Sequence, residues 1–282
     1  MGIKIIVDST ADLTDQVRQR VEVVPLTIRF ADVEYIDGIT IDSQTFYEKL
    51  VESDVLPTTS QATPFAFEEA FSQAVDKGDH VVCITCSSKL SGTYQSAVIA
   101  AGDYPRKVYV VDSETVSIGA GILTEYALTL VDRGLEAEEI ARELTQKRGS
   151  IRVLALLDTL EYLKKGGRIS KTAAFAGGIL NIKPVVCIDS GEIRLLGKAR
   201  GSRQGNNLLA QEIGKAGGVD FAMPMLLGYT GISDALLRKY IADSAPMWEG
   251  RTECLPVRVV GSTVGTHAGP GAVAAAFFAQ SP

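Results

Sequence analysis

Hydroxyl side chains gather in residues 87–97, whose sequence SSKLSGTYQSA follows directly on the apolar run VVCIT. We expect a buried parallel strand to end here and a helix to begin, so that unpaired backbone N–H groups point into the crevice at the sheet edge. Such a helix end carries partial positive charge and binds anions. Ser91 adds a neutral donor beside it, and Gly92 lets the backbone approach a ligand closely. The pattern predicts an anion site, with helix capping as the equal alternative for Ser91.

A second hydroxyl cluster stands in LPTTSQATP, residues 56–64, between two expected helices. Thr63 suits the N-cap of the following helix, and Pro64 suits its first turn. Thr59 and Ser60 have no such local role, which leaves their hydroxyls open to bind a ligand.

His267 and Arg168 are the candidate titratable and cationic groups. His267 lies in GSTVGTHAGPGA, residues 261–272, which we expect to form a glycine-rich turn before a helix of small residues, AVAAAFF. A histidine between glycines near a strand end is as consistent with a binding site as with a structural role. Arg168 follows a glycine pair in LKKGGRISK, where a helix should end, and a solvated cation is its alternative.

Cys83 and Cys86 have the CxxC spacing of redox and zinc sites. In a strand, however, positions three apart point to opposite faces. No second cysteine pair or histidine cluster is near in sequence to complete a zinc site. We therefore expect structural cysteines and no metal site. The sequence also has no GxxxxGK[ST] phosphate-binding loop, so we expect no ATPase activity from this chain alone.

The overall composition narrows the class of protein. The 282 residues carry a net charge of −6 with a pI near 5.1, which argues against nucleic-acid binding, because that needs many phosphate-neutralising cations. No apolar run approaches the roughly 20 residues that cross a bilayer. Asp8 interrupts the first apolar run too early for a signal peptide. We expect a cytoplasmic protein without stable membrane insertion.

Two kinds of segment must position these groups. Over residues 1–150, continuous apolar strands alternate with helices, which is typical of a mostly parallel sheet covered on both faces. Over residues 151–282, a helix is expected at KTAAFAGGILN, and IKPVVCI, DSGE and IRLLGKAR read as a β-hairpin. The prediction is an α/β fold with an N-terminal parallel α/β domain and a C-terminal α+β domain.

Six motifs, in this order, resemble the DegV family, the bacterial fatty-acid-binding proteins that include the FakB subunits of fatty acid kinase. The motifs are DSTADL (8–13), LPTTSQATP (56–64), SSKLSGTYQSA (87–97), LDTLEYLKKGGRIS (157–170), NIKP (181–184) and GTHAGPGA (265–272). They span almost the whole chain. Ala62 departs from the family pattern, which has proline at this place, a change that loosens the loop without removing a hydroxyl.

The resemblance implies a DegV-like two-domain fold with a long-chain fatty acid, such as palmitate, bound at the domain interface and no cofactor. It implies a carboxylate site made by Thr59, Ser60, Ser91, Gly92, His267 and Arg168. The chain would not be an enzyme itself. It would present the carboxylate to a separate ATP-dependent kinase, which makes an acyl phosphate. The oligomeric state is open from the sequence, and a monomer is the default expectation.

A basic stretch, RLLGKARGSR, stands out from the acidic chain and is the candidate surface for docking that kinase. The residues named for this role are Lys171, Lys198, Arg200 and Arg203. An ordinary exposed hairpin is the alternative interpretation of the stretch.

Two other functions stay open. A stand-alone fatty acid carrier or sensor would bind the same ligand without a kinase. The DegV fold also resembles the substrate domain of dihydroxyacetone kinases, in which a histidine holds a small ketone covalently, and His267 can be interpreted in this way. Such a site would be compact and polar, and it would carry a carbonyl adduct instead of a lipid.

Overall fold

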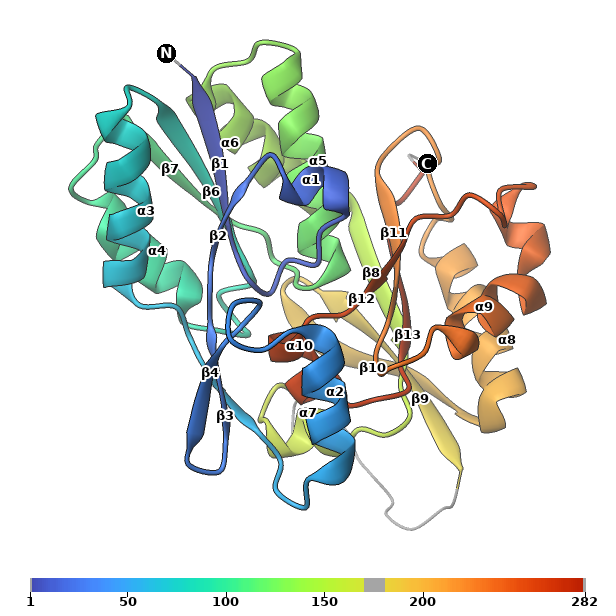
Figure 1. Cartoon of the computed structure of the whole chain (residues 1–282). Coiled ribbons are helices and arrows are strands. Elements are labelled where there is room, and N and C mark those ends of the chain that lie inside the picture. The colour runs from blue at the N-terminus through green and yellow to red at the C-terminus, as the bar shows by residue number, and fades with distance from the viewer. Residues whose placement is uncertain (1, 170–180, 281–282) are drawn as a thin grey trace.

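The computed structural model of the chain describes residues 2–169 and 181–280. Figure 1 shows two sheets side by side, with helices on their outer faces and between them. The third and smallest sheet lies below the first one, against two helices.

The first half of the chain builds a four-stranded parallel sheet with the order β2-β1-β6-β7. Helices α3 and α4 cover one face of this sheet, and α5 and α6 cover the other (Figure 1). The elements are β1 (Ile3–Asp8), α1 (Asp15–Arg18), β2 (Glu22–Val24), β3 (Thr27–Phe30), β4 (Val33–Ile36), α2 (Ser43–Glu52), β5 (Thr58–Ser60), α3 (Pro64–Asp76), β6 (His80–Thr85), α4 (Thr93–Ala101), β7 (Val108–Asp112), α5 (Ile118–Asp132) and α6 (Ala137–Lys147).

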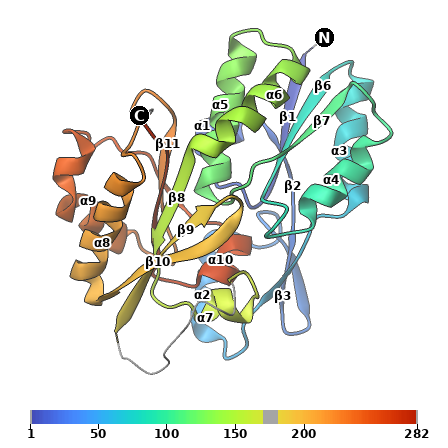
Figure 2. The same cartoon turned by 180° about the vertical axis from the view of Figure 1, so that it is seen from behind.

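The second half builds a six-stranded mixed sheet with the order β10-β9-β8-β13-β11-β12. Helices α8 and α9 cover its outer face, as Figure 2 shows from behind. The elements are η1 (Arg148–Ser150), β8 (Ile151–Leu156), α7 (Glu161–Lys165), β9 (Ile182–Asp189), β10 (Glu192–Arg200), α8 (Gly201–Lys215), β11 (Met225–Tyr229), α9 (Ala235–Asp243), η2 (Ala245–Trp248), β12 (Val257–Val259), α10 (Ser262–Ala268) and β13 (Val273–Phe278).

Helix α5 joins the two sheets, because it packs on β1 and β6 on one side and on β8, β11 and β13 on the other. Its buried side chains share one core with Leu226 of β11 and Ala276 of β13. Gly121 lets α5 approach the segment after β1 closely, because a β-carbon there would lie 2.1 Å from the carbonyl oxygen of Asp12. Only glycine fits there without moving backbone.

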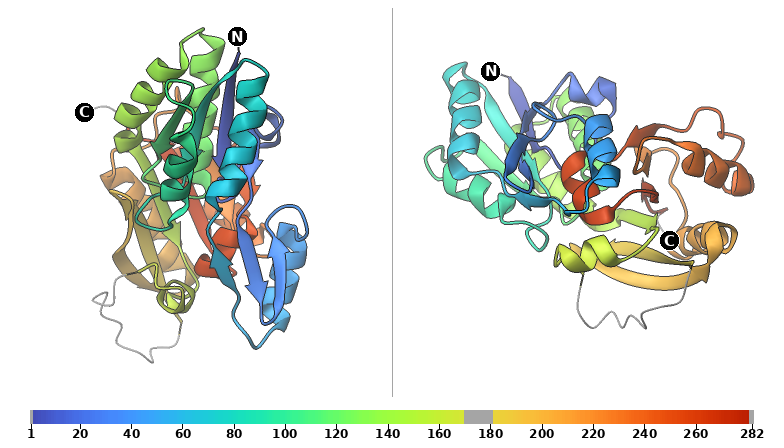
Figure 3. Two further views of the ribbon diagram at one scale, coloured as in Figure 1. Left: turned by 90° about the vertical axis from the view of Figure 1, so that its left-hand side faces the viewer. Right: turned by 60° about the horizontal axis from the view of Figure 1, so that its bottom comes forward.

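The three-stranded sheet β4-β3-β5 and helix α2 come from the first half of the chain but pack against α10 from its end. Figure 3 shows α2 beside α10 in its right-hand view. The Tyr47 hydroxyl of α2 donates a hydrogen bond to the carbonyl oxygen of Val260 at 3.0 Å. A β-carbon at Gly265 would lie 2.5 Å from that same hydroxyl oxygen, so glycine lets α10 sit directly on α2.

The α/β fold class and the parallel N-terminal sheet are confirmed, and so is the β9–β10 hairpin. Thr63 caps α3 through a 3.2 Å hydrogen bond from the backbone N–H of Ala66, as expected. All four strands of the parallel sheet precede residue 113, and all six of the mixed sheet follow residue 150. The division into two domains at residue 150 remains a prediction.

Two local expectations were wrong. The segment AVAAAFF is not a helix: β13 runs antiparallel to both β8 and β11 inside the mixed sheet. The helix propensity of three alanines gives way to burial, because small side chains suit a strand covered on both faces. His267 accordingly lies in helix α10, not in a turn. The helix expected over KTAAFAGGILN falls mainly outside the described residues.

None of the helices within residues 2–169 and 181–280 combines the length and apolar character needed to span a bilayer.

We expect Gly121→Ala to lower the free energy of unfolding by at least about 2 kcal/mol, because the added methyl group overpacks a rigid backbone contact. Gly214→Ala is the matched control, since Gly214 is also helical and a β-carbon there meets nothing within 4 Å. The control should gain stability, by up to about 1 kcal/mol, from helix propensity alone. Urea denaturation of both variants tests the contact, and equal stability changes would contradict it.

Candidate functional site

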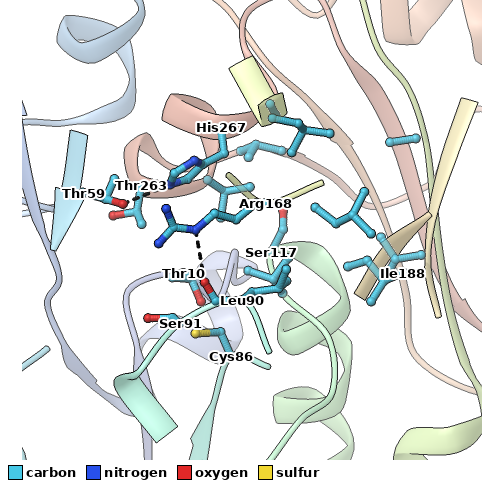
Figure 4. Close-up of a pocket in the computed structure, with 18 of the residues that line it drawn as sticks. Thr10, Thr59, Cys86, Leu90, Ser91, Ser117, Arg168, Ile188, Thr263 and His267 are labelled. Atoms are coloured by element: carbon cyan, nitrogen blue, oxygen red, sulfur yellow. Dashed lines mark hydrogen bonds between the residues drawn. The ribbon is translucent and has the colours of Figure 1, made fainter. Parts of the chain in front are cut away.

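A cavity of about 420 Å³ lies where the two sheets, β5 and α10 meet. It falls within the usual size range of small-molecule sites, which is about 300–1,000 Å³. Figure 4 shows polar side chains at one end, around His267 and Arg168, and Ile188 among apolar side chains at the other. The cavity is therefore divided along its length into a polar end and an apolar end.

The structure brings all six of the expected binding residues to this one cavity. They are Thr59 and Ser60 of β5, Ser91 and Gly92 just before α4, Arg168 after α7, and His267 of α10. They come from four separate segments of the chain. One cavity therefore brings together residues that lie far apart in the sequence.

His267 is bonded on one ring nitrogen and unpartnered on the other. Its Nε2 lies 2.9 Å from the Thr59 hydroxyl oxygen, which is drawn in Figure 4. Its Nδ1 is buried without a hydrogen-bond partner, and a β-carbon at Gly166 would lie 2.2 Å from it. Burial, and secondly the charge of Arg168, lowers the pKa of His267 to about 4. The imidazole is therefore neutral at pH 7.

Arg168 is a half-buried cation whose bonds go to carbonyl groups. Its Nε donates to the Leu90 carbonyl oxygen at 3.2 Å, and its Nη1 donates to the Gly166 carbonyl oxygen at 2.6 Å. No ion pair joins it to a carboxylate of the described residues. A guanidinium has five N–H donors, so positive charge and donors remain at the polar end of the cavity.

Three buried aspartates accept hydrogen bonds from other hydroxyls of the cavity wall. In each pair the hydroxyl donates to the carboxylate: Thr10 to Asp8 at 2.6 Å, Ser117 to Asp12 at 2.5 Å and Thr263 to Asp37 at 2.6 Å. Burial raises the pKa of all three carboxyl groups, that of Asp12 to about 7. Because a hydroxyl has one hydrogen, these three have none left to donate to a ligand.

The hydroxyls of Thr59, Ser60 and Ser91 are not bonded to a carboxylate. Thr59 contacts His267, and the Ser91 oxygen lies 2.9 Å from the Thr93 hydroxyl oxygen. The Ser91 oxygen also accepts a 3.3 Å hydrogen bond from the backbone N–H of Thr93, the first residue of α4, although Ser91 is not the N-cap of that helix. These hydroxyls are the donors that can turn toward an anion.

Gly92 stands at the start of α4, where no side chain caps the helix. A β-carbon there would lie 2.1 Å from the Gln61 side-chain oxygen. The Gln61 amide donates to Ser96 at 2.9 Å and lines the same cavity. Gln61 was missed by the sequence analysis, although it belongs to the same motif as Thr59.

The sequence analysis also missed the residues that line the apolar end of the cavity. Val153, Ala155 and Leu157 alternate along β8 and its extension, and Val186 and Ile188 alternate along β9. Side chains two apart in a strand share a face. Because the whole run IRVLALL is apolar, the sequence gives no sign of which face lines a cavity.

Cys83 and Cys86 lie in different environments, as their strand spacing predicts. Cys83 is buried in the core under α3 and α4, whereas Cys86 lines the cavity beside Ser91 (Figure 4). Burial raises the pKa of the Cys86 thiol well above its usual range, so it is a neutral thiol and a poor nucleophile.

Of the residues named for docking, Lys198, Arg200 and Arg203 are exposed, on β10 and at the start of α8. Lys171 lies outside the described residues. The neighbouring Arg194 pairs with Asp189 at 2.9 Å within the hairpin.

Comparison with known proteins gives consistent results. Residues 2–280 match the family model described as "Uncharacterised protein, DegV family". A DegV domain-containing protein of Caldanaerobacter subterraneus is 34% identical over 285 residues, covering 99% of each chain.

Two solved structures share the fold. A DegV family protein from Thermus thermophilus, described as fatty-acid-binding, has a TM-score of 0.88 and 30% identity, covering 99% of this chain and 100% of that one. A fatty acid kinase B3 protein from Streptococcus pneumoniae, solved with linoleic acid, has a TM-score of 0.84 and 24% identity over 99% and 100% of the two chains. At that identity, the second likeness concerns the fold alone.

We expect His267 to make stability depend on pH between about 6.5 and 4. In this window the unfolded chain takes up a proton on the imidazole and the folded chain does not, so the free energy of unfolding falls as pH falls, by about 3 kcal/mol in all. His267→Gln keeps a hydrogen-bonding group near Thr59 but does not titrate. Subtracting the denaturation curves of the variant from those of the wild type isolates this contribution, and parallel curves would show that the site does not suppress protonation.

Proposed function

The chain belongs to the DegV family, and from that premise we propose that it binds a long-chain fatty acid in the cavity, with the carboxylate at the polar end. The observation that carries the proposal is the division of one cavity into a polar end with uncommitted donors and an apolar end formed by β8 and β9. The T. thermophilus relative is itself described as fatty-acid-binding.

The polar end meets the needs of a carboxylate without a metal ion. A buried carboxylate must be hydrogen-bonded and charge-compensated, or it costs several kcal/mol. Ser91 and Thr59 supply hydroxyl hydrogens, the start of α4 at Gly92 supplies partial positive charge, and Arg168 supplies a full charge. Each charge-assisted bond contributes about 1.5–3 kcal/mol.

His267 acts on the ligand through Thr59 in this proposal. If Nε2–H donates to the Thr59 oxygen, the Thr59 hydroxyl hydrogen is free to point at the carboxylate. The opposite arrangement would use that hydrogen on the ring and leave an N–H at Nδ1 buried without an acceptor. The Nε2–H tautomer is therefore the one that suits the proposed ligand, and His267 is a positioning residue.

The apolar end supplies most of the affinity. Burial of each methylene contributes about 0.8 kcal/mol, so a long acyl chain gains on the order of 10 kcal/mol before ordering costs. The tail then holds the ligand and the head group sets its direction.

The site does not favour the ketone-binding alternative. A covalent adduct needs a free imidazole nitrogen, but Nε2 of His267 is bonded to Thr59 and Nδ1 lies against Gly166. The apolar side chains from β8 and β9 that line the cavity also offer no hydrogen bonds to a small polar ketone.

We further propose that the protein presents the carboxylate to an ATP-dependent kinase in the cytoplasm, as a monomer. Ser60 and Gly92 at the polar end are exposed, whereas Val153 and Ala272 of the apolar lining are buried. A carboxylate at the polar end is thus the part of the ligand that a partner can reach. The partner would transfer the γ-phosphoryl group of ATP to a carboxylate oxygen, giving an acyl phosphate and ADP.

Denaturing extraction followed by mass spectrometry tests the ligand. We expect fatty acid at about one molecule per protein chain in the wild type, because the buried tail slows its loss. Protein that yields none, and that takes up none when fatty acid is added, would overturn the proposal.

Substitutions at the polar end test which side chains bind the carboxylate, and a serine outside the cavity serves as the matched control. Ser91→Ala and Thr59→Val should each weaken fatty acid binding about tenfold or more, since each removes a bond to a charged group. Ser88→Ala changes an exposed serine of the same segment that lies outside the cavity and should bind like the wild type.

We expect the double variant Arg200→Glu/Arg203→Glu to lose acyl phosphate formation with the ATP-binding subunit of a bacterial fatty acid kinase while keeping fatty acid affinity. Both side chains are exposed, so the reversal acts on an encounter with an acidic surface and not on folding.

Arg238→Glu is the control, because it reverses an exposed charge on α9 that makes a surface ion pair with Asp234, and changes of such pairs have small effects on stability. If the double variant supports acyl phosphate formation as well as this control does, the docking assignment is wrong. If the wild type binds fatty acid and no kinase subunit acts on it, the carrier alternative is favoured.

A further inference from the structure

A second cavity, of about 590 Å³, lies behind the apolar end of the first. The two cavities share three lining residues: Val153 on β8, and Cys187 and Ile188 on β9. A thin layer of side chains therefore separates them.

The strand register explains why the layer lies there. Val153 and Ile188 are directly opposite each other, and they are the last pair of the β8–β9 ladder in this direction. Beyond them β8 continues beside β13 to Ile151, and β9 continues beside β10 to Asp189. The two strands thus separate just past this pair, whose side chains share one face.

Val153 is also held from the side by α5. A β-carbon at Gly119 would lie 2.5 Å from a methyl carbon of Val153 and 2.3 Å from the Thr115 hydroxyl oxygen. That hydroxyl is buried without a hydrogen-bond partner, and other atoms of Thr115 line the second cavity. Val153 therefore sits between an apolar space and a polar one.

The second cavity is chemically unlike the first. Arg148 pairs with Glu114 at 2.9 Å and Arg194 pairs with Asp189 at 2.9 Å on its walls. Arg152 donates to backbone carbonyls there. A methyl end that entered this space would meet charged groups and lose the benefit of apolar burial.

We propose that the Val153–Ile188 pair forms the floor of the acyl site and sets the longest chain that the protein binds well. This rests on the proposed fatty acid binding. A chain that reaches the floor is fully buried in the first cavity, and each further methylene must displace the pair or enter the charged space behind it.

The test measures affinity for a series of saturated fatty acids of increasing length, with wild type, Val153→Ala and Ile188→Ala. Each truncation removes methyl or methylene groups from the floor, so the preferred length should increase. For the acid two carbons longer than the wild-type optimum, affinity relative to that optimum should rise about tenfold.

Leu154→Val is the matched control. Leu154 neighbours Val153 on β8 and belongs to the core on the opposite face of the sheet. It lines the second cavity but not the first. Its chain-length profile should equal that of the wild type. Because Ile188 is less buried than Val153, Ile188→Ala keeps the test available if Val153→Ala does not fold.

Unchanged length preference in a folded floor variant, with fatty acid binding intact, would overturn the floor and leave the proposed function standing. A shift in Leu154→Val as large as in the floor variants would also overturn it, because the effect would then be general loosening. Absence of fatty acid binding in the wild type would overturn the proposed function and the floor together.

Discussion

Each hydroxyl has one hydrogen to donate, and this constraint decides where the cavity can hold an anion. Thr10, Ser117 and Thr263 spend theirs on Asp8, Asp12 and Asp37. At the polar end of the cavity, the hydroxyls that are not donated to a carboxylate belong to β5 and to the segment before α4, so an anion can be held there.

The same aspartates tie distant segments together. Asp37 accepts from Ser9 after β1 and from Thr263 of α10, and Asp12 accepts from the backbone of Gly261 as well as from Ser117. These bonds fix α10 against the edge of the parallel sheet, and α10 carries His267. Burial raises the pKa of Asp12 to about 7, so ionising it costs free energy in the folded state. The hydrogen bonds that Asp12 accepts offset part of that cost. They also hold the start of α10 in position.

Sequence patterns predicted the elements whose signals are local. The cap at Thr63, the strand-to-helix transition before α4 and the β9–β10 hairpin all have signals within a few residues. Sequence patterns failed where contacts with residues distant in the sequence determine the local structure. The alanines of β13 have a helical propensity that two flanking strands override, and Asp12 and Asp37 find partners more than 100 residues away. The motifs singled out the six residues that meet in the first cavity, but neither the motifs nor the hydrophobic pattern revealed its apolar lining.

A protein that presents a lipid must hold it firmly without covering the reacting end. In the proposed function these two tasks would be separate, because Ser60 and Gly92 at the polar end are exposed, whereas Val153 and Leu157 of the apolar lining are buried. Among the described residues that line the cavity, the neutral His267 leaves Arg168 as the one fixed positive charge. Addition of a phosphoryl group would increase the negative charge only at the open end, where water and a partner can solvate it, while the tail contacts stay the same. Affinity would then change little between acid and acyl phosphate, and binding that does not change along a reaction neither favours nor hinders it.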